Sequence, residues 1–262
     1  MTGIYYETAG DGPLVLLIPG GNGDAGPYGP LLRLLSDRFR VVAYDRRGFS
    51  RSELAGPLEE RFEQDIRDAV DLIDALSGDG MAYVFGSSSG AILGLHLLTR
   101  HPEKVRRLIA HEPPLVGLLP DADDWFAFFE KVTQTGRREG AQVAMQQFSA
   151  AVGLRIQRPQ VGVQLPDEVV EMMRRMDANQ EFFLEQELTN YTRREPDRAG
   201  LAAQRDKLVL AGGREAREAV PYRPNLILAE WLGLRVHDYP GDHIGYVTEP
   251  AEFAATLSAD LF

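Results

Sequence analysis

The sequence predicts an α/β fold: a mostly parallel, doubly wound sheet with a helical segment inserted as a cap. Short runs that are apolar on both faces recur along the chain, as expected of strands buried inside a parallel sheet. Amphipathic helical patterns with short links separate these runs, which is typical of right-handed strand–helix–strand crossovers. A long middle segment then has helical patterns without a good buried strand, which indicates the insertion.

Turn residues close the apolar runs and so give each predicted strand its bounds. The run Leu14–Ile18 is closed by Pro19-Gly20-Gly21, for example, and a pair of prolines follows soon after Val105–His111. The predicted strands span residues 4–7, 14–18, 41–44, 81–85, 105–111, 207–211 and 235–239. Helical spacing of apolar residues predicts helices over residues 62–76, 91–98, 224–232 and 250–257.

Residues 115–204 are rich in aromatic residues and methionine at helical spacing, with a helix start at Pro166-Asp167. We therefore expect an α/β core at residues 1–114 and 205–262 and a helical cap at residues 115–204. Most large apolar residues of such a cap pack against one another. The candidates for lining an apolar substrate pocket are Trp125, Phe128, Phe129, Met145, Met172, Met176 and Phe183.

Composition and charge narrow the classes of partner. The net charge of -11 disfavours nucleic acid and anionic membranes, because an acidic surface repels phosphate groups. The absence of cysteine excludes disulfides, thiolate catalysis and zinc–thiolate sites. No signal peptide is visible at the N-terminus, and the apolar runs are too short to span a bilayer. We expect a cytoplasmic protein with a small-molecule substrate and leave a homodimer open.

The segment Gly86-Ser87-Ser88-Ser89-Gly90 has the pattern Gly-x-Ser-x-Gly between a predicted buried strand and a helix. This is the setting in which the central serine of the pattern is a nucleophile. The turn must hold that serine in a strained conformation, which glycine on both flanks permits. Ser88 is the predicted nucleophile, while a turn that only caps the helix is the alternative interpretation.

A serine hydroxyl needs a base to become a good nucleophile, and His243 is the predicted base. It follows the last predicted strand, in a loop bracketed by Gly241 and Gly245, at the sheet edge where catalytic groups gather in α/β proteins. His96, His101 and His237 lie within or at the ends of helices and strands, which favours structural roles. His111 ends a strand and is a weaker candidate.

The third member of such a site is a carboxylate that orients the imidazole and stabilises its positive charge. Glu112 directly follows the strand that ends at His111, and two prolines after it limit its mobility. Glu215 follows the strand that ends at Ala211 but stands among charged residues that look solvated. Glu112 is the favoured acid because the imidazolium requires a buried carboxylate, and Glu215 remains the alternative.

The glycine-rich loop after the first buried strand predicts an oxyanion hole, because glycine lets backbone N–H groups approach a ligand. Gly21 and Asn22 are expected to act there with the N–H of Ser89. Gly21, Gly23 and Gly26 fit Gly-x-Gly-x-x-Gly, but the acidic residue and the lysine of nucleotide-binding motifs are missing. We expect no cofactor and no metal. The segment Asp45–Ser52 is interpreted as a charged turn that locks two loops.

Together these segments resemble the α/β-hydrolase fold family in the order found there. The resemblance rests on the first glycine loop, Asp45-Arg46-Arg47-Gly48, residues 86–90, His101-Pro102 and Gly241-Asp242-His243, and it covers the chain outside the cap. Two departures are Pro19, where many members have histidine, and Glu215 at the usual acid position. A subset similar to zearalenone-type lactonases takes its acid one strand earlier, where Glu112 stands.

The resemblance implies a serine esterase or lactonase that acts through an acyl-enzyme, with a hydrophobic substrate such as a macrolactone or aryl ester. Ser88 separates the chain from relatives that use an aspartate nucleophile. Hydrolysis of a carbon–carbon bond or a cofactor-free haloperoxidase-like activity is an alternative within this fold. A ligand-binding receptor that keeps the hydrolase scaffold is an alternative from a different class, and turnover distinguishes the two.

Overall fold

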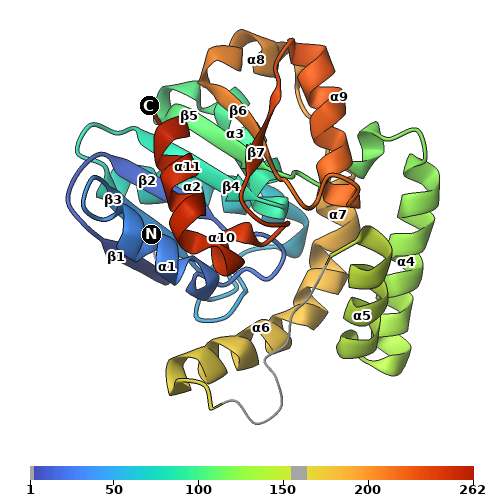
Figure 1. The fold of residues 1–262 in the computed structure, drawn as a ribbon. Helices are drawn as coiled ribbons and strands as arrows, with labels where there is room; N and C mark the ends of the chain where they lie inside the picture. Colours follow the sequence, from blue (N-terminus) through green and yellow to red (C-terminus); the bar gives the residue numbers. More distant parts are fainter. Residues whose placement is uncertain (1–2, 155–163) are drawn as a thin grey trace.

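The computed structural model describes residues 3–154 and 164–262 and has the predicted α/β fold (Figure 1). A seven-stranded sheet has the order β1-β3-β2-β4-β5-β6-β7. Its strands are β1 (Tyr6–Ala9), β2 (Leu14–Ile18), β3 (Arg40–Tyr44), β4 (Ala82–Ser87), β5 (Val105–His111), β6 (Leu208–Gly213) and β7 (Val236–Tyr239). β1 is antiparallel to β3, and the other neighbouring pairs are parallel, so the mostly parallel sheet is confirmed.

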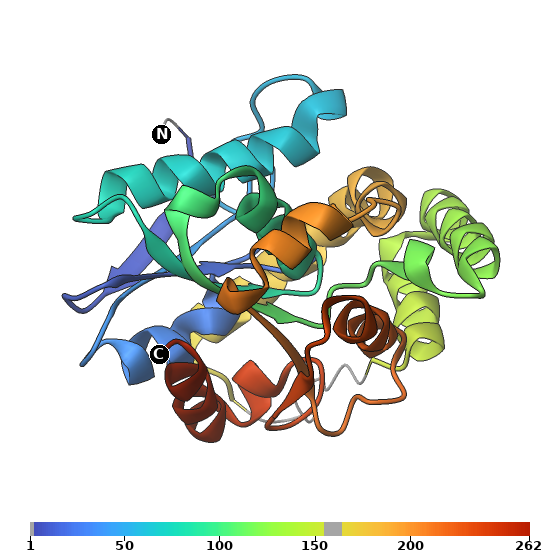
Figure 2. The same cartoon turned by 90° about the horizontal axis from the view of Figure 1, so that it is seen from above.

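Helices cover both faces of the sheet, as Figure 2 shows for α2 and α3 on one side and α1 and α11 on the other. The first face is covered by α2 (Arg61–Leu76), α3 (Ser89–Arg100), α8 (Arg198–Ala203) and α9 (Arg223–Leu232). The second is covered by α1 (Gly29–Leu35), α10 (Gly245–Thr248) and α11 (Pro250–Asp260). Along β2, Leu16 packs into the first apolar cluster and Leu17 into the second, which explains why this strand is apolar on both faces.

Three further helices form a layer beside the sheet, and we call them the cap: α4 (Ala122–Glu139), α5 (Ala141–Val152) and α6 (Asp167–Gln186). They pack around a third apolar cluster that includes Phe129 and Phe183. α7 (Leu188–Thr192) and α8 follow in the predicted insertion but pack on α3, with Tyr191 and Leu201 in the core cluster. Within the described ranges, none of the helices combines the length and hydropathy needed to cross a membrane.

The parallel strands bring their carboxyl ends, and the loops that follow, to one edge of the sheet. Gly20 and Gly21 follow β2, Ser88 follows β4, Glu112 follows β5, and His243 follows β7. The cap lies at this edge, because Phe183 on α6 is in close contact with Gly21. The fold therefore gathers the residues that the sequence singled out.

Candidate active site

The turn between β4 and α3 holds Ser88 in a strained backbone conformation. Ser88 has φ 56° and ψ -125°, outside the regions that residues with side chains ordinarily occupy. Its N–H donates to His111 O on β5 at 2.9 Å, and the residue is half-buried. Its side chain makes no capping hydrogen bond to α3, so helix capping does not explain a serine at this position.

Glycine is required on both sides of Ser88 because the backbone of neighbouring elements is too close for a side chain. A Cβ at Gly86 would lie 2.3 Å from Gly90 O, and a Cβ at Gly90 would lie 2.1 Å from Ile18 O. Both oxygens belong to the backbone and cannot move aside as the end of a flexible side chain could. The Gly-x-Ser-x-Gly pattern is therefore enforced by the packing of β4, α3 and β2.

His243, in the loop after β7, is bonded to Glu112, which directly follows β5. His243 Nδ1 and Glu112 Oε2 are 2.5 Å apart, and Gly213 N–H donates to Glu112 Oε1 at 2.7 Å. Both residues are buried, with Glu112 0% and His243 8% exposed. A carboxylate only accepts, so Nδ1 carries the proton and a neutral ring keeps a lone pair on Nε2.

Glu112 is held by its backbone as well as by its side chain. Its φ of 50° lies in the left-handed region, and its N–H donates to Ala211 O on β6 at 3.0 Å. Burial raises the pKa of Glu112, but the charge and hydrogen bond of His243, with a smaller contribution from Gly213 N–H, lower it more, so the net pKa lies below its ordinary value. The carboxyl group is therefore ionised at neutral pH, as stabilisation of an imidazolium requires.

Glu215, the other predicted candidate for the acid, lies elsewhere. It is exposed, and its backbone N–H donates to Gly241 O at 3.0 Å. Among the residues that the structure describes, its side chain has no hydrogen bond to His243. The geometry thus brings Glu112 to the imidazole and gives the segment around Glu215 a backbone contact with the histidine loop.

The loop after β2 lies against Ser88. A Cβ at Gly20 would be 3.0 Å from Ser88 Cβ and 3.7 Å from Ser88 Oγ. Gly23 N–H donates to Gly20 O at 2.9 Å and closes a four-residue turn, which we call the oxyanion turn. In the described part of the chain, the N–H groups of Gly21 and Asn22 within it have no acceptor. Ser89 N–H begins α3 and is free of helical bonds, so these three groups are the candidate oxyanion donors.

Of the seven predicted pocket residues in the cap, Phe183 lies nearest to these donors. A Cβ at Gly21 would lie 2.4 Å from Phe183 Cε2, so a side chain at this position would require the ring to move. The ring of Phe183 contacts Phe148, which in turn contacts Phe129 in the cap cluster. Trp125, Phe128 and Met145 pack against the same cluster. Met172 lies over Gly26, and Met176 is half-buried on α6. Substrate contact by these side chains stays a prediction.

Two surface hollows, of about 240 and 290 Å³, lie away from Ser88. The first lies on the outer side of α2 and is lined by Arg47, Asp68 and their neighbours, and the second lies between α4 and α6–α7. Both are bordered by charged side chains and contain none of the groups that catalysis would use. We therefore place the candidate active site by its chemistry at the sheet edge.

Residues Asp45–Ser52, the charged turn after β3, contact the oxyanion turn and the residues that follow it. Asp45 accepts hydrogen bonds from Ala25 N–H and from Arg51. These bonds join the loops after β2 and β3, as expected. Arg46 is fully buried and donates to Gly20 O at 2.8 Å, to Asp65 at 3.0 Å and to Glu187 at 2.6 Å. Burial lowers the pKa of Arg46, but Glu187 and Asp65 raise it more, and the guanidinium stays charged.

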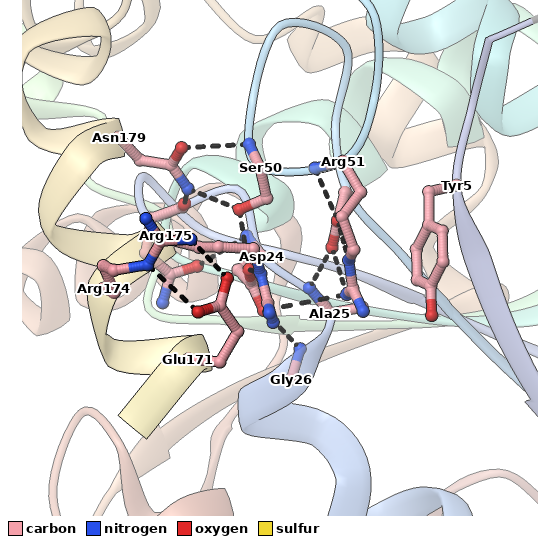
Figure 3. Close-up of polar contacts among 12 residues, drawn as sticks. Tyr5, Asp24, Ala25, Gly26, Ser50, Arg51, Glu171, Arg174, Arg175 and Asn179 are labelled. Carbon is pink, nitrogen blue, oxygen red and sulfur yellow. Dashed lines mark hydrogen bonds and ion pairs between the residues drawn. The ribbon is translucent and has the colours of Figure 1, made fainter. Parts of the chain in front are cut away.

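Sequence reasoning missed the polar residues on α6 that contact these loops (Figure 3). Arg175, Asn179, Phe183 and Glu187 recur every four residues and so share one face of the helix and its end; we call them the α6 stripe. Arg175 binds Asp24, Asn179 binds the backbone of the oxyanion turn, and Glu187 binds Arg46. The four-residue spacing was the available signal.

Comparisons with known proteins identify the family. A family model described as the alpha/beta hydrolase fold matches residues 13–166. An uncharacterized hydrolase of Bacillus subtilis, YraK, is 35% identical over 265 residues, which cover 97% of this chain and 90% of that protein. The chain belongs to the α/β-hydrolase family, as its motifs predicted, and is a hydrolase of that family.

Two further similarities lie within this family. A zearalenone hydrolase of Cladophialophora bantiana is 37% identical over 113 residues, 42% of this chain and 43% of that protein. The solved structure of a thermophilic esterase from Thermogutta terrifontis has a TM-score of 0.76 at 18% identity, covering 98% of this chain and 92% of that chain. At this identity, the structural likeness shows the fold.

Proposed function

We propose that this chain is a serine hydrolase that cleaves a carboxylic ester or lactone of a small hydrophobic substrate. The observation that carries the proposal is the 2.5 Å contact between His243 Nδ1 and Glu112, at the sheet edge that also holds the strained Ser88 turn. A buried, ionised carboxylate on Nδ1 suits the imidazole to act as a base through Nε2. The N–H groups of Gly21, Asn22 and Ser89 supply candidate donors for an oxyanion.

In the proposed reaction, Ser88 Oγ attacks the substrate carbonyl while His243 accepts the hydroxyl proton. The carbonyl oxygen becomes an oxyanion and is stabilised by the N–H groups of Gly21, Ser89 and Asn22. His243 then donates its proton to the leaving alkoxide, which leaves an ester between the acyl group and Ser88. A water molecule then loses a proton to His243 and attacks that ester, and His243 returns the proton to Ser88 Oγ as the acid is released. Glu112 stays ionised throughout.

Similar proteins and the contact of the cap with the loop after β2 support the choice of bond and substrate. The similar proteins include one named an esterase and one named a zearalenone hydrolase, which favours an ester or lactone bond. The ring of Phe183 over Gly21 supports a hydrophobic group next to the reacting carbonyl. The other predicted cap residues would then shape the more distant part of the pocket.

Labelling with a fluorophosphonate probe, together with turnover of short aryl esters, tests this function. The wild type should label rapidly and turn over, and Ser88→Ala should lose labelling and lower kcat by roughly 10³-fold or more. Ser36→Ala, at the end of α1, is the matched control and should keep both activities.

Three outcomes would contradict the proposal. A folded wild type that neither labels nor turns over esters would favour a ligand-binding protein on the hydrolase scaffold. Labelling that persists in Ser88→Ala would place the reactive hydroxyl elsewhere. Turnover of a carbon–carbon bond substrate in preference to every ester and lactone tested would keep the nucleophile and replace the reaction.

A further inference from the structure

Three of the four residues in the oxyanion turn are glycines, namely Gly20, Gly21 and Gly23. Glycine has more accessible backbone conformations than any other residue, so such a turn has little stiffness of its own. An oxyanion hole, by contrast, needs donors fixed in place before the reaction, since their alignment is what stabilises the transition state. The order of this turn must therefore come from groups outside it.

Contacts from the core hold two carbonyl groups of the turn. Gly20 O, which already accepts from Gly23 N–H within the turn at 2.9 Å, also accepts from the buried guanidinium of Arg46 at 2.8 Å. Gly23 O accepts from the backbone N–H of Arg46 at 2.8 Å. These contacts fix the beginning and the end of the turn and leave the Asn22 carbonyl, between them, to be held from another direction.

Asn179 on cap helix α6 holds that carbonyl. Its Nδ2 donates to Asn22 O at 2.7 Å. The same Nδ2 donates to Ser50 Oγ at 2.8 Å, and Oδ1 accepts from Ser50 N–H at 3.0 Å (Figure 3). The amide orientation follows from the partners, because a carbonyl oxygen needs a donor and a backbone N–H needs an acceptor. Asn179 is only 6% exposed and uses both its N–H groups and its oxygen in these bonds.

An ion pair between half-buried Arg175 on α6 and buried Asp24 keeps this helix in register with the same loops. Asp24 is fully buried and accepts from Arg175 Nε at 2.8 Å, from Ser50 Oγ at 2.6 Å and from Gly26 N–H at 2.7 Å. Burial raises the pKa of Asp24, but the hydrogen bonds from Arg175, Ser50 and Gly26 lower it more, so the carboxylate is charged. Ser50 itself has φ 50°, a conformation that these neighbours hold in place.

We propose that Asn179 is a positioning residue for the oxyanion hole, through which the cap orders the turn that carries the Gly21 and Asn22 N–H groups. The inference rests on the proposed function, since it assigns Asn179 a part in the same reaction. Asn179 touches no reacting atom and acts through the Asn22 carbonyl. The cap helix therefore does more than cover the substrate: its stripe completes the catalytic loop.

The test compares Asn179→Leu, similar in shape but without hydrogen-bonding groups, with Gln180→Leu on the same helix. Gln180 donates to Asp177 at the exposed side and has no contact with the turn among the described residues. Asn179→Leu should lower kcat for a short aryl ester by about 10- to 100-fold and change KM by less than about threefold, because the loss falls on the transition state. Gln180→Leu should retain wild-type kcat and KM.

An arylboronic acid gives a second readout that a merely structural role would not move. Boronic acids form a tetrahedral adduct with a serine hydroxyl and place an oxygen where the oxyanion would lie. The inhibition constant of the arylboronic acid should rise in Asn179→Leu by the same factor by which kcat/KM falls. Ser50→Ala, which removes one partner of Asn179 and keeps the bond to Asn22 O, should cost less than about threefold in kcat.

The outcomes separate the inference from the proposed function. A wild type without labelling or turnover rejects the function, and the inference fails with it. An active wild type with Asn179→Leu at wild-type kcat overturns the inference alone. Equal losses in Asn179→Leu and Ser50→Ala, or a loss confined to KM, would also overturn it, because they would assign Asn179 to docking of α6. If Asn179→Leu folds poorly, Asn179→Ser carries the same expectations.

Discussion

The ends of β5 and β6 each carry a glutamate, and the fold treats the two residues in opposite ways. Glu112 follows β5 directly, is fully buried, and has a left-handed φ of 50°. Glu215 lies two residues past β6, in an exposed turn. β5 lies between β4 and β6, so the neighbouring strand can supply Ala211 O and Gly213 N–H to fix Glu112. A carboxylate becomes part of a site where neighbouring strand ends enclose it.

The buried Glu112–His243 pair and the exposed pairs near Glu215 also differ in how much they contribute to stability. Two buried groups that can carry charge cost desolvation energy, which only good geometry and further hydrogen bonds offset. Gly213 N–H supplies one such bond at the second carboxylate oxygen. Exposed pairs around Glu215, such as Arg214 with Glu249, are screened by solvent and contribute little.

The largest expected effect comes from exchanging the two carboxylates for amides. Glu112→Gln keeps the size of the side chain but removes the charge and offers an amide to His243, which should lower kcat by roughly 10³- to 10⁴-fold. Glu215→Gln, the matched control, should stay within about twofold of wild type. Steady-state kinetics on an aryl ester at neutral pH measures both, with circular dichroism to establish folding.

The reverse order of effects would reject Glu112 as the orienting acid. A Glu112→Gln enzyme that retains more than about a tenth of wild-type kcat would do the same. Equal, modest losses in both variants would mean that either residue can support the imidazole, and the contrast between the two strand ends would then have no consequence for catalysis.

The sequence predicted the core of the fold because its signals are local. Leu14–Ile18 is a continuous apolar run, Val105–His111 has a buried apolar stretch from Leu108 to Ala110, and the structure has the predicted bounds for both strands. Gly86 and Gly90 predict a tight turn, and the close packing of the backbone around both positions explains why they are glycine. Such features depend on neighbours in the chain and on the period of the sheet.

The support of the oxyanion turn could not be predicted in the same way. Asn179 meets Asn22 across 157 positions of the chain, and nothing near either residue marks the partner. The bounds of the cap were drawn by composition, which cannot reveal that Tyr191 and Leu201 pack on α3. The sequence favoured Glu112 over Glu215 on expected burial, but the bonds that hold Glu112 come from β6, which is its neighbour only in the folded sheet.

A substitution at Gly213, where the end of β6 contacts the loop that carries His243, should have an intermediate effect on kcat. A Cβ at Gly213 would lie 2.6 Å from the backbone of Asp242 and 2.7 Å from Gly241 O. Gly213→Ala should therefore displace the loop that carries His243 and lower kcat by about 10- to 100-fold. Gly78→Ala is the control, because a Cβ there meets nothing within 4 Å. Wild-type kinetics in both variants would contradict the expected clash.

The smallest effect at neutral pH is expected for His111, the last residue of β5. It is fully buried, and burial lowers its pKa to about 4, helped by His243 and opposed by Glu112. The unfolded chain binds a proton on this residue below about pH 6.5, whereas the folded chain does not until about pH 4. Stability from this residue is therefore complete above pH 6.5 and is lost as the pH falls through that window.

His111→Phe places another aromatic ring among Phe85, Tyr239 and Phe253 and removes the titration. Urea unfolding at pH 7 and pH 4.5 should show that the wild type loses on the order of 2 to 3 kcal/mol more than His111→Phe between the two conditions. The pH 7 value serves as the internal reference for the packing change. Parallel losses in the two proteins would show that His111 gains a proton in the folded state as readily as in the unfolded chain. The end of β5 would then be open to solvent, and its contrast with the end of β6 would disappear.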